Sequence, residues 1–179
     1  MIQKFSKLLR HFRRREDGSA SVEFALLFTP FMVLMASSYE VSLANIRHVY
    51  LERGVDLAVR EIRLSTGSAP NKEEIRSGVC SIARVIPNCK EVLEIELVPV
   101  NMDTWNLPNS VPECIDKNKD FNPLTQYSNG AQNELMLIRF CAVAQKTFPT
   151  FGFLSFPRHP ADPSAYRLIT TTAFVNEPT

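Results

Sequence analysis

A single carboxylate stands at the start of the most apolar stretch of the chain. Glu23 is followed by 16 uncharged residues, from Phe24 to Tyr39. A charged side chain at the centre of a bilayer costs on the order of 2.5–3.5 kcal/mol, so a carboxylate beside such a stretch calls for a functional explanation. The chemistry expected of Glu23 is therefore charge pairing in surroundings of low dielectric constant.

The four cysteines are the second group of residues that can do chemistry, and all of them lie after residue 79. An even number of cysteines confined to one part of a chain indicates disulfides in an oxidising compartment, although four cysteines allow three pairings. We expect Cys80 to pair with Cys89 as a short local bridge, and Cys114 to pair with Cys141, which fixes a long loop to a strand. The alternative is a metal site. Because the chain has no C-x-x-C pair and no histidine nearby, we expect no metal and no cofactor.

The remaining reactive residues do not form a catalytic set that the sequence reveals. The three histidines fall in separate regions of the chain: His11, His48 and His159. No nucleophile elbow, phosphate-binding loop or H-E-x-x-H zinc motif is present. The D-x-N-x-D run at 116–120 resembles the start of a calcium loop, but Phe121 replaces its glycine and Tyr127 its bidentate glutamate. We expect that the chain is not an enzyme.

The charges around the apolar stretch predict its orientation in a membrane. Six lysines and arginines, and no acidic residue, lie within the first fifteen positions. The positive-inside rule keeps such a cluster in the cytoplasm and places the chain beyond the apolar stretch on the other side. Sixteen helical residues cover about 24 Å, so a full span of about 30 Å extends over about residues 22–44. The whole chain carries 20 basic and 19 acidic residues, a balance that predicts no nucleic-acid partner.

The N-terminal region fits three classes of segment. A cleaved secretory signal needs a small-residue site after the apolar run, and residues 35–38 match one only faintly. A plain one-pass anchor explains the charge and the hydropathy but gives no reason for Glu23. The third class is a prepilin-type N-terminus: Gly18 precedes Ser19, and counted from Ser19 the fifth residue is Glu23 and the sixth Phe24. This resemblance implies cleavage after Gly18, with Glu23 facing the new amine of the same or a neighbouring subunit.

The helical pattern continues beyond the apolar stretch. Apolar residues recur at spacings of three and four from Val41 to Ile62, with charged and polar residues between them. The Ser-Thr-Gly-Ser run at 65–68 and Pro70 stop this pattern, which predicts one helix over residues 19–64. Its apolar stripe lies against the protein's own head or against a neighbour's helix, and we favour the head. Pro30 predicts a kink or local melting within the helix.

Residues 65–179 predict an α+β head. Asn71 caps a helix whose apolar face extends to Val85 or Ile86. Residues 91–100 alternate as a half-buried strand, and two further strands are expected at 134–145 and 166–175. The long loop at 101–130 has no assigned role, and four phenylalanines at 148–156 form a patch for core closure, membrane contact or subunit contact. These elements indicate a small antiparallel sheet packed on helices.

Three stretches, in this order, resemble one family. GSASVEFALLFTPFM at 18–32 resembles the N-termini of the TadE-like minor pseudopilins of the bacterial tight-adherence (Tad/Flp) pilus. IRFCAVAQKTFPTFGFL at 138–154 resembles the strand and the proline- and aromatic-rich turn of that family. TTTAFVNEP at 170–178 resembles its closing strand and its Asn-Glu-Pro ending. Residues 65–130 carry no resemblance.

The resemblance implies a division into a basic leader at 1–18, a long helix at 19–64 and a periplasmic head at 65–179. A prepilin peptidase would cut between Gly18 and Ser19, with Glu23 and Phe24 at the acidic and aromatic positions of the motif. The product would be a single-pass protein of the inner membrane, with a cytoplasmic N-terminus, that joins or initiates a pilus used in adhesion or biofilm formation.

The partners implied are the prepilin peptidase, other pilin or pseudopilin subunits, the inner-membrane assembly platform and the lipid bilayer. The major pilins of such systems are far shorter and lack a head, so the resemblance implies an accessory subunit. The alternative is a single-pass, membrane-anchored periplasmic binding or adaptor protein with no pilus role.

Overall fold

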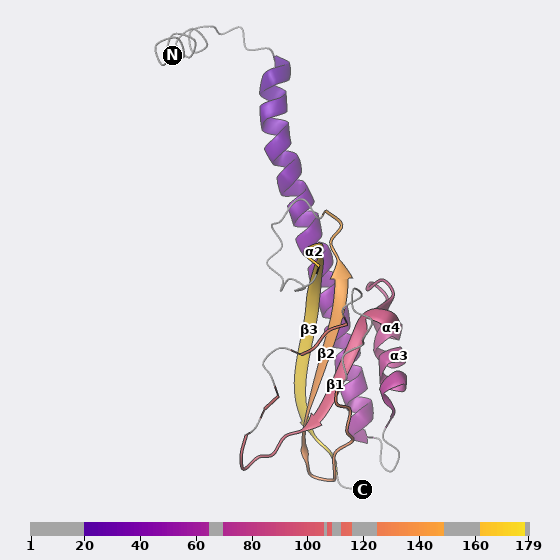
Figure 1. Cartoon of the computed structure of the whole chain (residues 1–179). Helices are drawn as coiled ribbons and strands as arrows, with labels where there is room; N and C mark the ends of the chain where they lie inside the picture. The colour runs from indigo at the N-terminus through magenta and orange to yellow at the C-terminus, as the bar shows by residue number, and fades with distance from the viewer. Residues whose placement is uncertain are drawn as a thin grey trace. The chain divides into compact units, whose positions relative to one another are not determined.

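The computed structural model describes residues 20–64, 70–105, 107–108, 112–115, 125–148 and 162–177. The elements in chain order are α2 (Ala20–Leu64), α3 (Lys72–Ile82), α4 (Cys89–Val92), β1 (Leu93–Pro99), β2 (Leu135–Gln145) and β3 (Ala165–Val175), drawn in Figure 1. A long helix followed by a small three-stranded antiparallel sheet with helices is the α+β class expected from the sequence. The chain divides into two units, Met1–Tyr39 and Glu40–Thr179, and the boundary falls inside α2.

Helix α2 is one uninterrupted helix of 45 residues, as the sequence pattern predicts. Pro30 lies inside it, and the local melting expected at this proline does not occur. A proline removes a single backbone hydrogen bond from a helix, whereas the turns on either side keep theirs. The helix ends at Leu64, immediately before the Ser-Thr-Gly-Ser run that was expected to stop it.

The three strands form an antiparallel sheet in the order β1-β2-β3. The register places Leu97 opposite Ile138, and Ile138 opposite Thr172. Since side chains alternate between the two faces of a sheet, the residues that form the main core lie on one face of all three strands. These core residues include Leu93, Ile95, Leu97, Met136, Ile138, Phe140, Tyr166 and Leu168.

The C-terminal half of α2 contributes to this same core. Its buried apolar residues follow the spacing of three and four read from the sequence: Ala44, Leu51, Val55, Ala58 and Ile62. The apolar stripe of α2 therefore packs on the protein's own head. Gly54 lets α3 approach closely, because a Cβ atom at this position would lie 3.0 Å from the carbonyl oxygen of Val79. Figure 1 shows this part of α2 running behind the sheet, with α3 beside it.

Helix α3 begins with the cap expected at Asn71. Its side chain accepts a hydrogen bond from the backbone N–H of Glu74, and the Glu74 carboxylate accepts one from the backbone N–H of Asn71, both at 2.9 Å. The helix ends at Ile82, although its apolar face was expected to continue to Val85 or Ile86. Ile86 is nevertheless buried, since the turn that follows α3 packs on the core.

A short helix precedes the first strand, where the sequence predicted strand from residue 91. Asn88 adopts the left-handed conformation, with φ of 52°, and its carbonyl oxygen accepts hydrogen bonds from the N–H groups of Glu91 and Val92. These bonds close the helical turn of α4, so β1 begins at Leu93. The prediction failed because Glu91 fits a polar position of an alternating strand as well as one of a helical turn, so periodicity does not separate the two.

Both faces of β1 are covered, so the prediction of a half-buried strand was wrong. Glu94, on the face opposite the core, has only 4% of its surface exposed. Its carboxylate contacts the ammonium of Lys72, the guanidinium of Arg76 and the hydroxyl of Thr125. Buried charges need such partners. The sequence did not indicate that two of them would come from residues 22 and 18 positions earlier, and the third from a threonine after β1.

Part of the stretch expected as a loop at 101–130 is paired with the sheet. The N–H of Leu97 donates to the carbonyl of Gln126 at 2.9 Å, and the N–H of Ser128 donates to the carbonyl of Leu97 at 3.0 Å. The pairing of Leu97 with Tyr127 is parallel. This segment covers the edge of β1 and so removes an exposed strand edge on that side.

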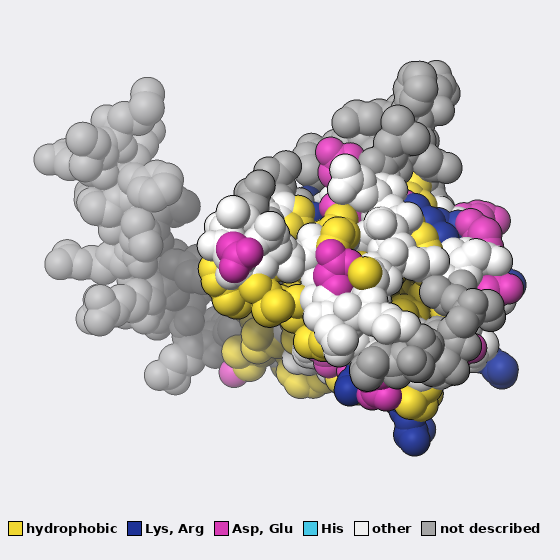
Figure 2. All heavy atoms as spheres, turned by 90° about the horizontal axis from the view of Figure 1, so that it is seen from below, with side chains coloured by type: hydrophobic (Ala, Val, Ile, Leu, Met, Phe, Trp, Pro, Cys, Tyr) yellow, Lys and Arg dark blue, Asp and Glu magenta, His cyan; other side chains and the backbone are white. Residues whose placement is uncertain are grey.

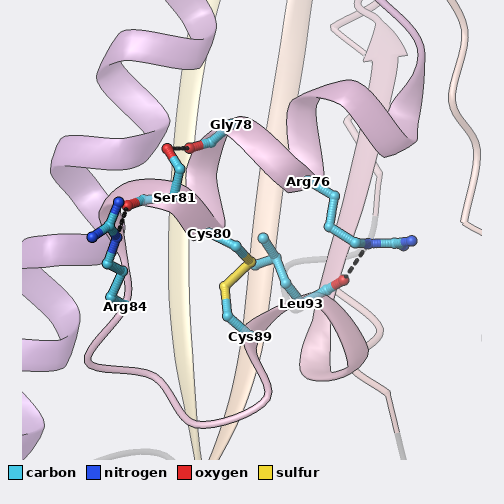
Figure 3. Close-up of a disulfide and its surroundings, with 7 residues drawn as sticks. All are labelled: Arg76, Gly78, Cys80, Ser81, Arg84, Cys89 and Leu93. Atoms are coloured by element: carbon cyan, nitrogen blue, oxygen red, sulfur yellow. Dashed lines mark hydrogen bonds between the residues drawn. A yellow bond between two sulfur atoms is a disulfide. The ribbon is translucent and has the colours of Figure 1, made fainter.

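The four cysteines lie in two pairs at disulfide distance, and these are the pairs expected from the sequence. Cys80 is joined to Cys89, which links α3 to α4 (Figure 3). Cys114 is joined to Cys141, which ties the segment between β1 and β2 to the middle strand. Beside the first pair, the Nε of Arg76 donates to the carbonyl of Leu93 at 3.1 Å. Two covalent links therefore hold the head together.

Candidate functional site

The motif predicted at the N-terminus falls partly within the described structure. Gly18 and Ser19 lie outside the described residues. Glu23 lies in the first turn of α2, which begins at Ala20. A carboxylate in the first turn is stabilised by the positive end of the helix dipole, and Glu23 lies within about one turn of the first described residue of α2. The position of Glu23 therefore suits the charge pairing that its sequence context suggested.

Phe24 sits beside Glu23 and stacks on another ring of the same helix. Its centroid lies 5.0 Å from that of Phe28, with 20° between the ring planes. The two rings are 63% and 43% exposed, respectively. Exposed apolar surface of this kind marks a site of contact with a membrane or another protein.

The first unit exposes apolar side chains on every side of α2. Ten large hydrophobic residues there are exposed: Val22, Phe24, Leu26, Leu27, Phe28, Phe31, Met32, Leu34, Met35 and Tyr39. A helix that is hydrophobic all round is typical of a membrane span or of the centre of a large protein. Within the described residues, α2 contains the one stretch long and apolar enough to cross a membrane. The transmembrane part was expected at about 22–44, but Glu40 and Ala44 are buried and belong to the second unit.

Two hydroxyl groups of this stretch are satisfied inside the helix. The hydroxyl of Thr29 donates to the carbonyl of Ala25 at 2.9 Å, and that of Ser37 donates to the carbonyl of Val33 at 2.7 Å. An unpaired hydroxyl costs several kcal/mol in hydrocarbon, so these bonds make both residues compatible with lipid. The one side chain from Ala20 to Tyr39 that carries a charge at neutral pH is Glu23.

A second carboxylate, Glu40, ends the uncharged run and has a role that the sequence did not reveal. Only 4% of its surface is exposed. Its two oxygens accept hydrogen bonds from the backbone N–H groups of Thr147, at 2.8 Å, and Phe148, at 3.1 Å. The signal that could have found it is its position on the buried stripe, four residues before Ala44. A charged residue on an apolar stripe predicts a buried partner.

Arg47 extends this polar contact along the same stripe. Its Nη1 donates to the hydroxyl of Tyr166 at 2.7 Å and to the carbonyl of Gln145 at 3.2 Å. Burial raises the pKa of Tyr166, and the hydrogen bond and charge of Arg47 oppose that rise. Glu40 and Arg47 together fasten α2 to the end of β2, to the turn that follows it and to the start of β3.

In the described part of the chain, the other candidate residues from the sequence are not brought together into a reaction centre. His48 lies with its Nε2 at 3.3 Å from the carbonyl oxygen of Ile169 and its Nδ1 at 3.6 Å from the Glu52 carboxylate. His11, His159, the calcium-like run at 116–120 and the phenylalanines after Phe148 fall outside the described residues. Among the residues described, no three of the types His, Cys, Asp and Glu are grouped to hold a metal ion.

Comparison with protein-family models, curated proteins and solved structures gave no match. Two features of the chain bear on its function: the carboxylate in the first turn of an all-round apolar helix segment, and the packing of the same helix into a disulfide-linked head.

Proposed function

We propose that this chain is an accessory, pilin-like subunit of a bacterial tight-adherence pilus. It is processed by a prepilin peptidase after Gly18, and it is anchored in the inner membrane by the apolar half of α2 with its head in the periplasm. The observation that carries the proposal is the continuity of α2. One helix exposes apolar side chains around a single carboxylate in its first part and enters the core of the head in its second part.

Cleavage after Gly18 gives Glu23 a partner. The new α-amine of Ser19 is mostly protonated at neutral pH, since α-amines have pKa values of about 7.7–8.0. Ser19 and Glu23 are four residues apart, which places them on the same side of a helix. An ammonium and a carboxylate that pair in lipid cost far less together than either does alone. The pair forms within one subunit or between the amine of one subunit and Glu23 of the next.

The head fits an oxidising compartment outside the cytoplasm. Two disulfides tie its elements together, and such bonds persist in the periplasm but are rare in the cytosol. The cluster of lysine and arginine before Gly18 orients the chain in the same sense, with the head outside. The partners are then the peptidase, other pilin or pseudopilin subunits, the assembly platform and the bilayer.

The role of Glu23 is tested with Glu23→Ala in cells that assemble the pilus. Cleavage and the amount of membrane-bound protein should stay close to wild type, whereas pilus number should fall sharply. Glu61→Ala is the matched control, because it removes an exposed carboxylate from the same helix within the head. Normal piliation with Glu23→Ala would remove the assembly role. Normal piliation after deletion of the whole chain would instead favour a membrane-anchored adaptor.

A further inference from the structure

We infer that one end of the head rests on the bilayer surface, through Thr147 and Phe148, and that Glu40 holds these residues there. This end is the one at which β2 ends. The inference rests on the proposed function only in requiring that the apolar half of α2 spans the membrane.

The position of this contact follows from the hydrogen bonds of Glu40. The uncharged run ends at Tyr39, and Glu40 is the next residue of the same helix. Its carboxylate binds the backbone N–H groups of Thr147 and Phe148 directly. Glu40 lies about 1.5 Å along the helix axis from the last residue of the run, so the groups bound by its carboxylate are held to the first residue after the run.

The depth of the contact follows from the length of the run. Residues 24–39 cover about 24 Å as a helix, which is less than the hydrocarbon thickness of about 30 Å. Both ends of the run must therefore lie at or inside the hydrocarbon boundary, and Glu40 is drawn to that boundary with them. A free carboxylate is costly at this depth, but Glu40 is buried and satisfied by two N–H groups.

The side chains at this end suit the boundary between headgroups and acyl chains. Tyr39 is 55% exposed, Val41 38% and Phe148 36%. Tryptophan and tyrosine concentrate at both surfaces of a bilayer, where their rings meet the acyl chains and their polar groups meet water, and Tyr39 is of this kind. The bilayer interface is therefore the surface that these exposed side chains fit.

The opposite end of the head provides a contrast. Pro99, the last residue of β1, pairs with Met136 near the start of β2, so the segment after β1 lies at the far end of the sheet from Gln145. The eleven residues of β2 separate the two ends by about 33 Å. Trp105, the single tryptophan of the chain, belongs to that far segment and is 63% exposed. Figure 2 views this end, where acidic, basic, polar and apolar side chains are interspersed.

Tryptophan quenching in vesicles tests the contact on the full chain. Lipids that carry a quencher either at the headgroup–acyl boundary or at the bilayer centre are compared. Native Trp105 is measured in the wild-type protein, and single tryptophans are placed by Phe31→Trp, Thr147→Trp and Phe148→Trp in a Trp105→Phe background. Thr147→Trp provides a second probe in case Phe148→Trp fails to fold, because Thr147 is exposed and contributes its backbone to the contact.

The expected pattern separates the two proposals. The Phe31→Trp emission should be quenched most strongly from the bilayer centre, the Thr147→Trp and Phe148→Trp emissions from the boundary, and the Trp105 emission by neither lipid. Adding Glu40→Ala to Phe148→Trp should reduce its boundary quenching. If the tryptophan at 31 is quenched and those at 147 and 148 are not, the surface contact is refuted and the membrane span stands. If the tryptophan at 31 escapes quenching, both proposals fail.

Discussion

The two halves of α2 differ in what surrounds them, although they form one helix. From Ala20 to Tyr39 the large apolar residues are exposed on all sides. From Glu40 to Leu64 the apolar residues at spacings of three and four are buried against the sheet, while the other faces carry most of the charge. Backbone helicity is the same in both halves. The difference therefore comes from the distribution of side chains and from the surroundings that each distribution requires.

The two carboxylates that flank the uncharged run show the same contrast. Glu23 is exposed in the first turn of the helix. Glu40 is buried and bound by two backbone N–H groups of the head. Glu40 is satisfied within the head and serves the fold, whereas Glu23 has no ion pair among the described residues and is available for one outside them. Glu23 is therefore the residue that we assign to assembly.

The largest expected effect is on the stability of the head. Leu51→Ala should lower the free energy of unfolding by about 2–5 kcal/mol, because Leu51 is fully buried in the core. Leu27→Ala is the matched control, since Leu27 is 67% exposed and lies in the other half of α2. Urea unfolding of the full chain in detergent micelles measures both. A comparable loss for both variants would contradict the division of α2 into two functional halves.

The reciprocal experiment concerns membrane insertion. Met32→Arg places a charge at the middle of the apolar run and should disfavour insertion by about 2.5–3.5 kcal/mol. Val49→Arg introduces the same charge on an exposed position of the head half and should leave insertion unchanged. A membrane-insertion assay gives the inserted fraction of each chain. Equal insertion of the two variants would show that the apolar half does not enter lipid.

A smaller effect is expected from the carboxylate that fastens the two parts of the head. Glu40→Ala leaves the N–H groups of Thr147 and Phe148 without their acceptor, which should cost about 1–3 kcal/mol of stability. Glu23→Ala should leave the unfolding of the head unchanged. Urea midpoints under identical detergent conditions compare the two. A stable Glu40→Ala head would mean that the buried carboxylate does not hold α2 to Thr147 and Phe148 after β2.

The smallest effect is a pH response confined to the head. Burial, and then the charge of Glu74, raise the pKa of Tyr127 from about 10 to about 12, and its hydroxyl donates to the carbonyl of Pro70 at 2.7 Å. The unfolded chain loses this proton near pH 10 and the folded chain near pH 12. The contribution of the Tyr127 hydroxyl to the free energy of unfolding is therefore fully present below about pH 10 and is lost as the pH rises toward about 12. Unfolding measured across this range should show the decline.

Tyr127→Phe should remove that part of the alkaline decline, because phenylalanine has no proton to lose. It should also lower stability at neutral pH by about 0.5–1.5 kcal/mol through loss of the hydrogen bond. Tyr50→Phe, on an exposed face of α2, is the control and should keep the decline. An alkaline profile that is unchanged in Tyr127→Phe would show that another group sets it.

The features that local pattern determines were predictable from the sequence. The spacing of apolar residues gave the extent of α2, the apolar run at 134–145 gave the position of β2, and the Asn71 cap gave the start of α3. The misses involve groups that meet only in the folded chain. The partners of Glu94, the pairing of Leu97 with residues 126–128 and the contact of Glu40 with Thr147 join positions far apart in the sequence. Periodicity carries no information about such pairs.

The candidate site divides in the same way. The acidic and aromatic positions at Glu23 and Phe24 are visible in the sequence because they are fixed by their distance from Gly18. The sequence offered one signal for Glu40, its position on the apolar stripe four residues before Ala44, but it did not identify the partners. The two backbone N–H groups that bind Glu40 belong to residues 107 and 108 positions away.

The N-terminal sequence of the membrane-bound protein tests the central claim most directly. The full chain is expressed with an active prepilin peptidase and, as the control, with a peptidase whose catalytic aspartates are replaced. We predict a mature chain that begins at Ser19 with the active enzyme and one that keeps its N-terminal residues with the inactive enzyme. A membrane-bound protein that begins at Met1 in both cases would contradict the account and would support a simple one-pass anchor.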